Sequence, residues 1–319
     1  MMRSMCRRLV VALLVVMGVA VSPARVEVHT PTPQNAAAPQ RSTVSVDGHP
    51  IAVWARVPAT PREAVLLVHG RTWSSRPDFD LQVPGLKRSV MQSLADRGIA
   101  AYAIDLRGYG ETPRDASGFN TPQRAADDVA AVLKWIAGRH PSLEKPALLG
   151  WSNGAVVALH VAQTSPALLS SVVLFGFTPS PTYNILPVPA PRVAPKTKNT
   201  AEAARSDFIT PQVTPPAVIR AFVTAALASD PIYAEWKDEH QWSVLRADKL
   251  TSPVLIIHGE NDPGADPRAA GDFLAEASAH TRSYVVLPLA DHCAQLEDTH
   301  EAFISVVVEF MTRPGPVRR

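Results

Sequence analysis

The chain has 319 residues, of which 46% are hydrophobic and 19% charged, and its formal net charge is +2. This length and composition fit a globular protein with one large domain and exclude a disordered or fibrous chain. The nearly balanced charge, without a basic stripe, argues against nucleic-acid binding.

The first residues have the pattern of a targeting segment. Arginines precede an unbroken apolar run from Leu9 to Val21, and Ser22-Pro23-Ala24 offers small residues for cleavage after Ala24. The apolar run is short for a transmembrane helix. We therefore predict a signal peptide over residues 1–24 and an exported protein, periplasmic or extracellular. An uncleaved N-terminal membrane anchor is the alternative, and only then would a membrane be a partner.

The segment after the signal peptide indicates a linker and then a hairpin. Residues 25–42 are rich in Pro, Thr, Gln and Ala, which is typical of a flexible linker. Two alternating runs then flank Asp47-Gly48, a dipeptide that favours a tight turn between antiparallel strands.

From here strands and helices alternate. We expect a strand over 64–69, a helix over 83–97, a strand over 99–105 and a helix over 121–137 that begins after Thr121. This order predicts the α/β class, with a mostly parallel sheet, helices on both faces and a functional site at the carboxyl ends of the strands.

Residues 147–160 form the most informative stretch of the chain. An apolar strand runs through Gly150-Trp151-Ser152-Asn153-Gly154 into an Ala/Val-rich helix. This is the G-x-S-x-G nucleophile elbow in its required strand–turn–helix context. The glycines allow the strand and the helix to approach closely around a strained serine. Ser152 is therefore the predicted nucleophile.

The alternation is interrupted after the strand expected over 171–177. Residues 179–250 form an insertion that opens with a proline-rich stretch and has helical patterns at 200–209 and 215–229. The core is therefore assigned to residues 43–178 and 251–313. The core pattern resumes with a strand over 252–258, a helix over 267–279, a strand over 283–288 and a helix over 298–312.

Two loops after these last strands carry the remaining catalytic residue types. Asp262 follows one strand and His292 follows the next. A serine hydroxyl needs a base to remove its proton, and that base needs an orienting acid. Ser152, Asp262 and His292 stand in the nucleophile–acid–histidine order of this chemistry. There are four alternatives. Asp262 is a plain turn residue, or His292 is a solvated loop residue. Glu260 is the acid in place of Asp262, or Cys293 is a thiol nucleophile.

The chain from about residue 43 to 312 resembles the α/β-hydrolase superfamily, in the subgroup with a helical cap. The matching motifs are V-L-L-V-H-G at 65–70, D-L-R-G-Y-G at 105–110, G-W-S-N-G at 150–154, H-G-E-N-D at 258–262 and D-H-C-A-Q-L-E at 291–297. The resemblance implies that residues 179–250 are the cap. It also implies that the backbone N–H groups of Arg71 and Asn153 form an oxyanion hole, and that no cofactor is needed.

The resulting prediction is an exported serine hydrolase that cleaves a carboxylic ester, or a related acyl bond, in a small-molecule substrate. A non-catalytic binding protein on the same scaffold is one alternative. A serine peptidase of the aminopeptidase kind is another, and it would need acidic cap residues to hold the substrate amine. A metal cluster of His69 and His258 near His292 is disfavoured, since His69 and His258 fit better as turn residues that form hydrogen bonds at the loop bases. The candidate amine-binding residues are Asp230, Glu235, Asp238 and Glu239.

Overall fold

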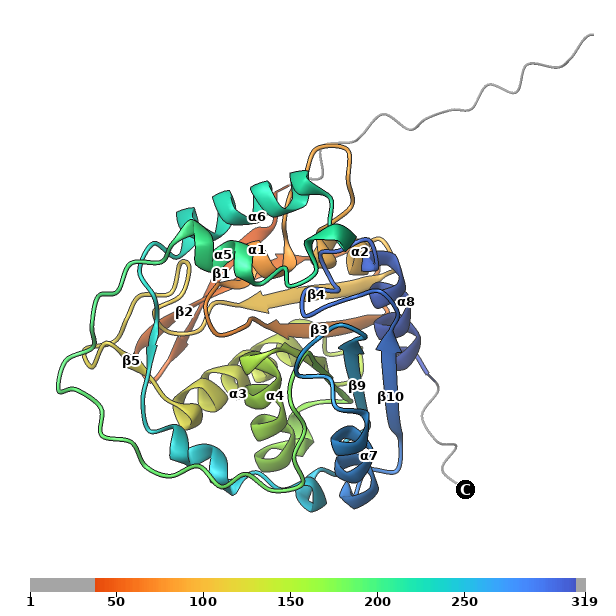
Figure 1. Ribbon diagram of the computed structural model, residues 1–319. Helices are drawn as coiled ribbons and strands as arrows, with labels where there is room; N and C mark the ends of the chain where they lie inside the picture. Colours follow the sequence, from red (N-terminus) through yellow and green to blue (C-terminus); the bar gives the residue numbers. More distant parts are fainter. Residues whose placement is uncertain (1–37, 314–319) are drawn as a thin grey trace, which may run out of the picture. The chain divides into compact units, whose positions relative to one another are not determined.

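The computed structural model describes residues 38–313, so the signal peptide predicted for residues 1–24 lies outside the described residues. An eight-stranded sheet forms the centre of this part of the chain (Figure 1). The strands are β1 (Gln40–Val46), β2 (His49–Arg56), β3 (Glu63–Val68), β4 (Ile99–Ile104), β5 (Phe119–Asn120), β6 (Ala147–Trp151), β7 (Val172–Phe175), β8 (Glu235–Trp236), β9 (Val254–Gly259) and β10 (Arg282–Leu287). The α-helices are α1 (Ser75–Phe79), α2 (Val90–Ala95), α3 (Pro122–Arg139), α4 (Asn153–Thr164), α5 (Ala201–Ser206), α6 (Pro216–Ser229), α7 (Pro267–Glu276) and α8 (His300–Met311). Four short 3-10 helices are η1 (Pro166–Leu168), η2 (Pro211–Val213), η3 (Glu239–Val244) and η4 (Ala247–Lys249).

The sheet is mostly parallel, in the order β1-β2-β4-β3-β6-β7-β9-β10. Only the pairs β1–β2 and β2–β4 are antiparallel. Strands β4, β6, β7 and β9 are buried along their whole length. Parallel strands are buried in this way because helices cover both faces of the sheet. The α/β prediction is therefore confirmed, with the carboxyl ends of β3, β6, β7, β9 and β10 at one edge.

The predicted hairpin is present. β1 and β2 pair from Gln40 opposite Ala55 to Val46 opposite His49. The two residues of the turn, Asp47 and Gly48, both have positive φ, as a tight turn between twisted strands requires. β1 begins within the linker predicted for residues 25–42.

Two groups of helices cover the two faces of the sheet (Figure 1). Apolar side chains of α3, α4 and α7 share one buried cluster with the sheet, and those of α1, α2 and α8 share the other. The helix predicted over 121–137 is α3, and the Thr121 side chain accepts a hydrogen bond from the Arg124 N–H as expected of an N-cap. Among residues 38–313 no helix is both long and apolar enough to cross a membrane.

The helix predicted over 83–97 is wrong in its first half. The structure has only α2 there, and residues 83–86 form a turn closed by a bridge between Val83 and Leu86. Gly85 has φ +77°, which no helix allows, and the Ser89 side chain caps the helix by accepting a hydrogen bond from the Gln92 N–H. The helix therefore begins where its cap lies, rather than where the apolar spacing begins.

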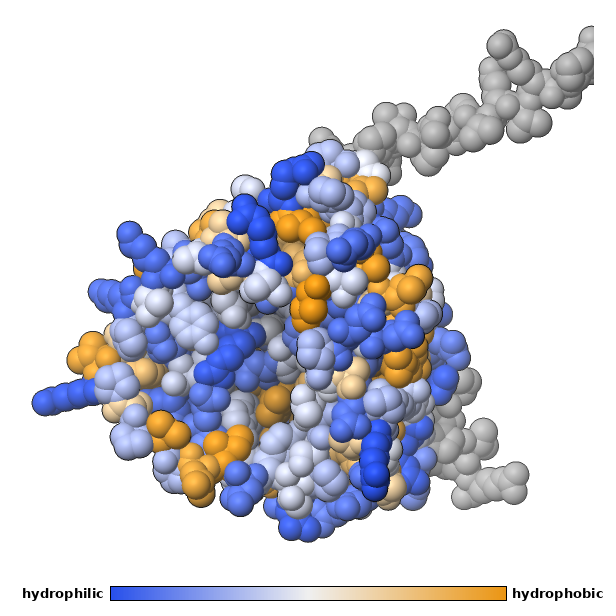
Figure 2. Space-filling view, in the orientation of Figure 1, coloured by the Kyte–Doolittle hydropathy of each residue, from blue (hydrophilic) through white to orange (hydrophobic). Residues whose placement is uncertain are grey.

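The predicted insertion, residues 179–250, runs from the end of β7 to the start of β9. Residues 179–199 contain no helix or long strand. α5 and α6 follow them, α6 lies beside α1, and α5 lies beside α6 (Figure 1). β8 pairs with β5 in a separate two-stranded sheet. Leu186, Val188 and Val193, within residues 179–199, are exposed. The face of the molecule shown in Figure 2 mixes hydrophobic with hydrophilic residues. The division into core and cap stays a prediction.

Candidate active site

Ser152 lies in the sharp turn between β6 and α4. Its backbone has φ 56° and ψ −120°, a strained conformation for a residue with a side chain. Neither neighbouring glycine can carry a side chain: a Cβ on Gly150 would overlap the Gly154 backbone, and one on Gly154 would overlap the carbonyl oxygen of Val68. The close approach of strand and helix therefore holds Ser152 at the sheet edge.

His292 and Asp262 lie together at the same edge. His292 Nδ1 is 2.9 Å from Asp262 Oδ2, and the second carboxylate oxygen of Asp262 accepts a hydrogen bond from the Gly264 N–H at 2.8 Å. The Asp262 side chain is 2% exposed, whereas that of His292 is 21% exposed. The carboxylate is thus held by hydrogen bonds on both oxygens, and the imidazole is partly exposed.

The charges of this pair support each other. Burial by itself raises the pKa of Asp262, but the hydrogen bond and the charge of His292 outweigh it and lower that pKa below its usual value. Burial likewise lowers the pKa of His292, and the hydrogen bond and charge of Asp262 outweigh it and raise the pKa of His292 above its usual value. The imidazole is therefore a stronger base than an isolated histidine.

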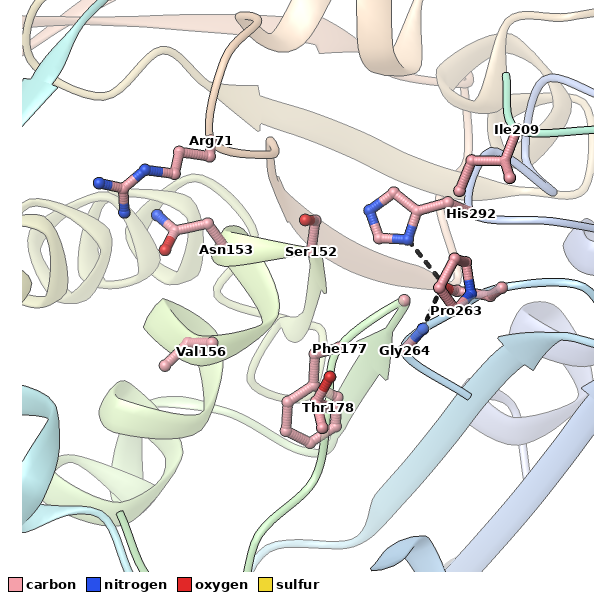
Figure 3. Close-up of a pocket in the computed structure, with 12 residues that line it drawn as sticks. Arg71, Ser152, Asn153, Val156, Phe177, Thr178, Ile209, Pro263, Gly264 and His292 are labelled. Atoms are coloured by element: carbon pink, nitrogen blue, oxygen red, sulfur yellow. Dashed lines mark hydrogen bonds and ion pairs between the residues drawn. The ribbon is translucent and has the colours of Figure 1, made fainter. Parts of the chain in front are cut away.

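Ser152 and His292 both line a pocket of about 520 Å³ at the carboxyl edge of the sheet. Figure 3 shows the second ring nitrogen of His292 on the side of Ser152. Among the described residues 38–313 the Ser152 hydroxyl makes no hydrogen bond to this ring, although both groups line the same pocket. Such contacts often tighten only when substrate binds.

Arg71 and Asn153 line the same pocket, and their backbone N–H groups donate no hydrogen bond to other described residues. Asn153 is the first residue of α4, where N–H groups have no partner inside the helix. The loop that carries Arg71 is held by the Gly70 N–H, which donates to Asp78 Oδ2, and by the Tyr109 hydroxyl, which donates to the Arg71 carbonyl. Both N–H groups are therefore available to an anion beside Ser152.

The competing catalytic residues lie elsewhere. Glu260 is exposed, and its side chain accepts a hydrogen bond from the Leu289 N–H rather than from His292. Cys293 is fully buried, and burial raises the pKa of its thiol well above the usual value, so it stays protonated. The histidines also have partners: His69 contacts Leu106 N and its own loop, and His258 contacts the Phe177 carbonyl. No group of three or more His, Cys, Asp or Glu side chains in residues 38–313 could hold a metal ion.

The acidic residues considered for an amine site do not line either described pocket. Asp230 is buried and accepts hydrogen bonds from the backbone N–H groups of Ser74 and Gly110. Glu239 forms a two-point ion pair with the Arg71 guanidinium at 2.8 and 2.9 Å. Both carboxylates therefore join the predicted cap to core loops.

Three residues near the nucleophile were not expected from the sequence. Trp151 donates a hydrogen bond from Nε1 to the His292 carbonyl at 2.8 Å and lies beside its ring. Gly176 has φ +62°, and a Cβ there would lie 3.2 Å from the His292 ring. Asp207, from the predicted cap, lines a small cavity beside Ser152. Trp151 is the second residue of the G-x-S-x-G motif, so the sequence carried a signal for it, whereas no motif pointed to Asp207.

The fold and this arrangement of side chains define an α/β-hydrolase. Residues 59–299 match the family described as serine aminopeptidase, S33 (Hydrolase_4). The chain belongs to this family and is an α/β-hydrolase enzyme.

The chain is similar to a lipase, to a methyl ester esterase and to a hydrolase of known structure. A monoacylglycerol lipase of Mycolicibacterium smegmatis is 26% identical over 238 residues, which is 70% of this chain and 80% of the lipase. A pimeloyl-acyl-carrier-protein methyl ester esterase of Neisseria meningitidis is 29% identical over 271 residues, 77% of this chain and 93% of the esterase. A hydrolase from Pseudomonas aeruginosa PA01 has the same fold, with a TM-score of 0.61 and 19% identity over 88% of this chain and 100% of its own.

Proposed function

We propose that the protein is an exported serine esterase that acts on a carboxylic ester of a small molecule. The observation that carries this proposal is the position of Ser152, His292 and Asp262 around one pocket, with His292 Nδ1 hydrogen bonded to Asp262. The relatives named as a lipase and as a methyl ester esterase support an ester as the bond that is cleaved.

In the proposed reaction His292 Nε2 takes the proton of the Ser152 hydroxyl as Oγ attacks the carbonyl carbon. The backbone N–H groups of Arg71 and Asn153 bind the oxyanion that forms, and each such donor lowers the barrier by about 2.7–4 kcal/mol. The alcohol leaves with the proton from His292. Water then attacks the acyl-enzyme, His292 takes a proton from it, and the acid is released as Ser152 recovers its own proton. Asp262 holds the ring and stabilises its charged form throughout.

The test is the Ser152→Ala variant with p-nitrophenyl esters. We expect a fall in kcat of at least about 10³-fold, because the nucleophile is lost. A fluorophosphonate probe should label the wild type at Ser152 and leave the variant unlabelled. Unchanged turnover in the variant would refute the proposal, and unlabelled wild type would favour a scaffold without this nucleophile.

Export is proposed from the sequence alone, from the arginines and the apolar run Leu9–Val21. We expect the mature protein to begin at Arg25, after cleavage behind Ala24. Mass spectrometry of the mature N-terminus checks this. A chain that keeps residues 1–24 and sediments with membranes would indicate an anchor instead.

A further inference from the structure

Two cavities, rather than one, meet at Ser152. The main pocket has a volume of about 520 Å³ and the second about 60 Å³. Arg71, Ser152 and His292 line both of them, whereas Trp73 and Asp207 line only the smaller one. The carbonyl carbon of the ester must lie at Ser152 Oγ. The acyl chain and the alcohol group, which are the two arms of the ester, must leave this point in different directions. The two cavities are therefore the space into which the arms extend.

The cavities differ in what they can hold. A water molecule takes up about 30 Å³ in the liquid, so the small cavity has room for roughly two water-sized groups. The main pocket falls within the range of about 300–1,000 Å³ that is usual for small-molecule ligand sites.

The walls of the small cavity are fixed by hydrogen bonds. The Trp73 indole is buried and donates from Nε1 to Asp207 Oδ2 at 2.6 Å. The Trp151 indole is also buried and donates from Nε1 to the His292 carbonyl. The Asp207 backbone carbonyl in turn accepts from Cys293 Sγ at 3.2 Å. Enlarging the cavity by turning an indole would break one of these bonds without a replacement, so these two walls resist enlargement.

The main pocket has a more open wall. Ile209, which lines it from the predicted cap, is 45% exposed, and Val156 on α4 is half-buried (Figure 3). A long substrate arm can therefore extend past these residues toward solvent.

We propose that the substrate is strongly asymmetric about its ester group, with one arm limited to about one or two carbon atoms in the small cavity and the other arm long or bulky in the main pocket. This inference rests on the proposed esterase function. One extra methylene in a hydrophobic pocket typically changes kcat/KM by about 10–200-fold, so we expect a steep limit on the length of the short arm.

The experiment compares two ester series with the purified enzyme. One series varies the alcohol from methyl to hexyl on a fixed long acid, and the other varies the acid from acetyl to hexanoyl on a fixed bulky alcohol. We expect kcat/KM to fall at least about tenfold per added methylene beyond two carbons in one series, and to change little in the other. The steep series identifies the short arm.

The possible failures differ. Equal dependence on length in both series would overturn the asymmetry while leaving the esterase proposal intact. Absence of turnover with every ester would overturn the esterase proposal, and this inference with it.

The Asp207→Ala variant tests whether the small cavity sets the limit on the length of the short arm. Removing this carboxyl widens the small cavity, so the limit should extend by about one or two carbons in the short-arm series, and the first excluded ester should gain about tenfold in kcat/KM. Asp207→Asn keeps the volume and should leave the limit unchanged. Val156→Phe narrows only the main pocket and should impair only the long-arm series. Thermal unfolding checks that each variant is folded. If the limit stays unchanged in Asp207→Ala, or moves equally in Asp207→Asn, the assignment of the short arm to this cavity is wrong.

Discussion

The pH dependence of the enzyme follows from one imidazole. His292 must be neutral to accept the Ser152 proton, and Asp262 raises its pKa above the usual value near 6.5. The folded enzyme therefore holds a proton on His292 at pH values where free histidine has lost it. We expect kcat/KM to rise with pH with a midpoint above 6.5, measured with a substrate that does not titrate in this range.

The Asp262→Asn variant tests the origin of that midpoint. Loss of the carboxylate should lower kcat by on the order of 10⁴-fold and move the midpoint to lower pH. Asp266→Asn is the matched control, because Asp266 caps α7 and does not contact His292. A midpoint that stays in place in Asp262→Asn would show that another group titrates.

Glu297 provides a second prediction at this scale. Burial and the nearby Asp291 carboxylate raise its pKa to about 9. Between about pH 4.5 and 9 the folded chain therefore binds a proton that the unfolded chain releases, so the free energy of unfolding falls as pH rises. Glu297→Gln removes this group at nearly constant shape. We expect the variant to become progressively more stable than the wild type from pH 5 to pH 8.5, measured by urea unfolding.

The exposed residue Glu276 supplies the control for that measurement. Glu276→Gln should leave the pH slope of the wild type unchanged. If Glu297→Gln gives the same slope as the wild type, then Glu297 is ionised in the folded protein.

The residues nominated by the sequence and those found only in the structure differ in one respect. Ser152, Asp262 and His292 each follow a strand of the parallel part of the sheet. Parallel strands bring their carboxyl ends to one edge, so chain order alone predicts that the three residues lie close together. Asp207 follows a short helix in the insertion. Its place beside Ser152 depends on how that segment packs, which no periodicity in the sequence encodes. The roles of all four residues stay predictions.

At the scale of elements, the elbow depends on its two glycines, of which Gly154 gives the clearest test. A Cβ on Gly154 would come closer than 3.0 Å to the carbonyl oxygens of Val68 and His69, and backbone cannot yield as a side chain can. We expect Gly154→Ala to lower the free energy of unfolding by about 3 kcal/mol or more, measured by urea unfolding.

Gly138→Ala is the control for this substitution. Gly138 lies in α3 with nothing within 4 Å of an added Cβ, so alanine should stabilise the chain by about 0.5–1 kcal/mol. Similar effects of the two substitutions would contradict the steric account of the elbow.

Caps explain which element boundaries the sequence could supply. α3 starts where Thr121 and Pro122 predict, because both the cap and the proline specify the first turn. The error at 83–97 arose from apolar spacing continuing through the Pro84-Gly85 turn, and the Ser89 cap gives the correct start. The pairing of β5 with β8 could not be predicted, since two-residue strands carry no alternation.

At the scale of the whole described chain, the predicted cap and the core are joined by a buried carboxylate. Asp230 ends α6 and accepts hydrogen bonds at 2.8 Å from the N–H groups of Ser74 and Gly110, which lie in two core loops. Burial raises its pKa to about 6. The sequence showed an acidic residue after a helix, but only the packing of the insertion shows that both oxygens bind backbone N–H groups.

We therefore expect Asp230→Ala to lower the free energy of unfolding by about 1–3 kcal/mol, because it leaves the buried Ser74 N–H without an acceptor and breaks the bond to the Gly110 N–H. Glu235→Ala, at the half-buried first residue of β8 in the same segment, should change it by less than about 0.5 kcal/mol. Urea unfolding measures both, and kcat/KM for an amino-acyl ester and for its des-amino analogue should fall by the same factor in Asp230→Ala. A selective loss of the amino-acyl substrate, at unchanged stability, would instead make Asp230 part of an amine site and restore the peptidase hypothesis.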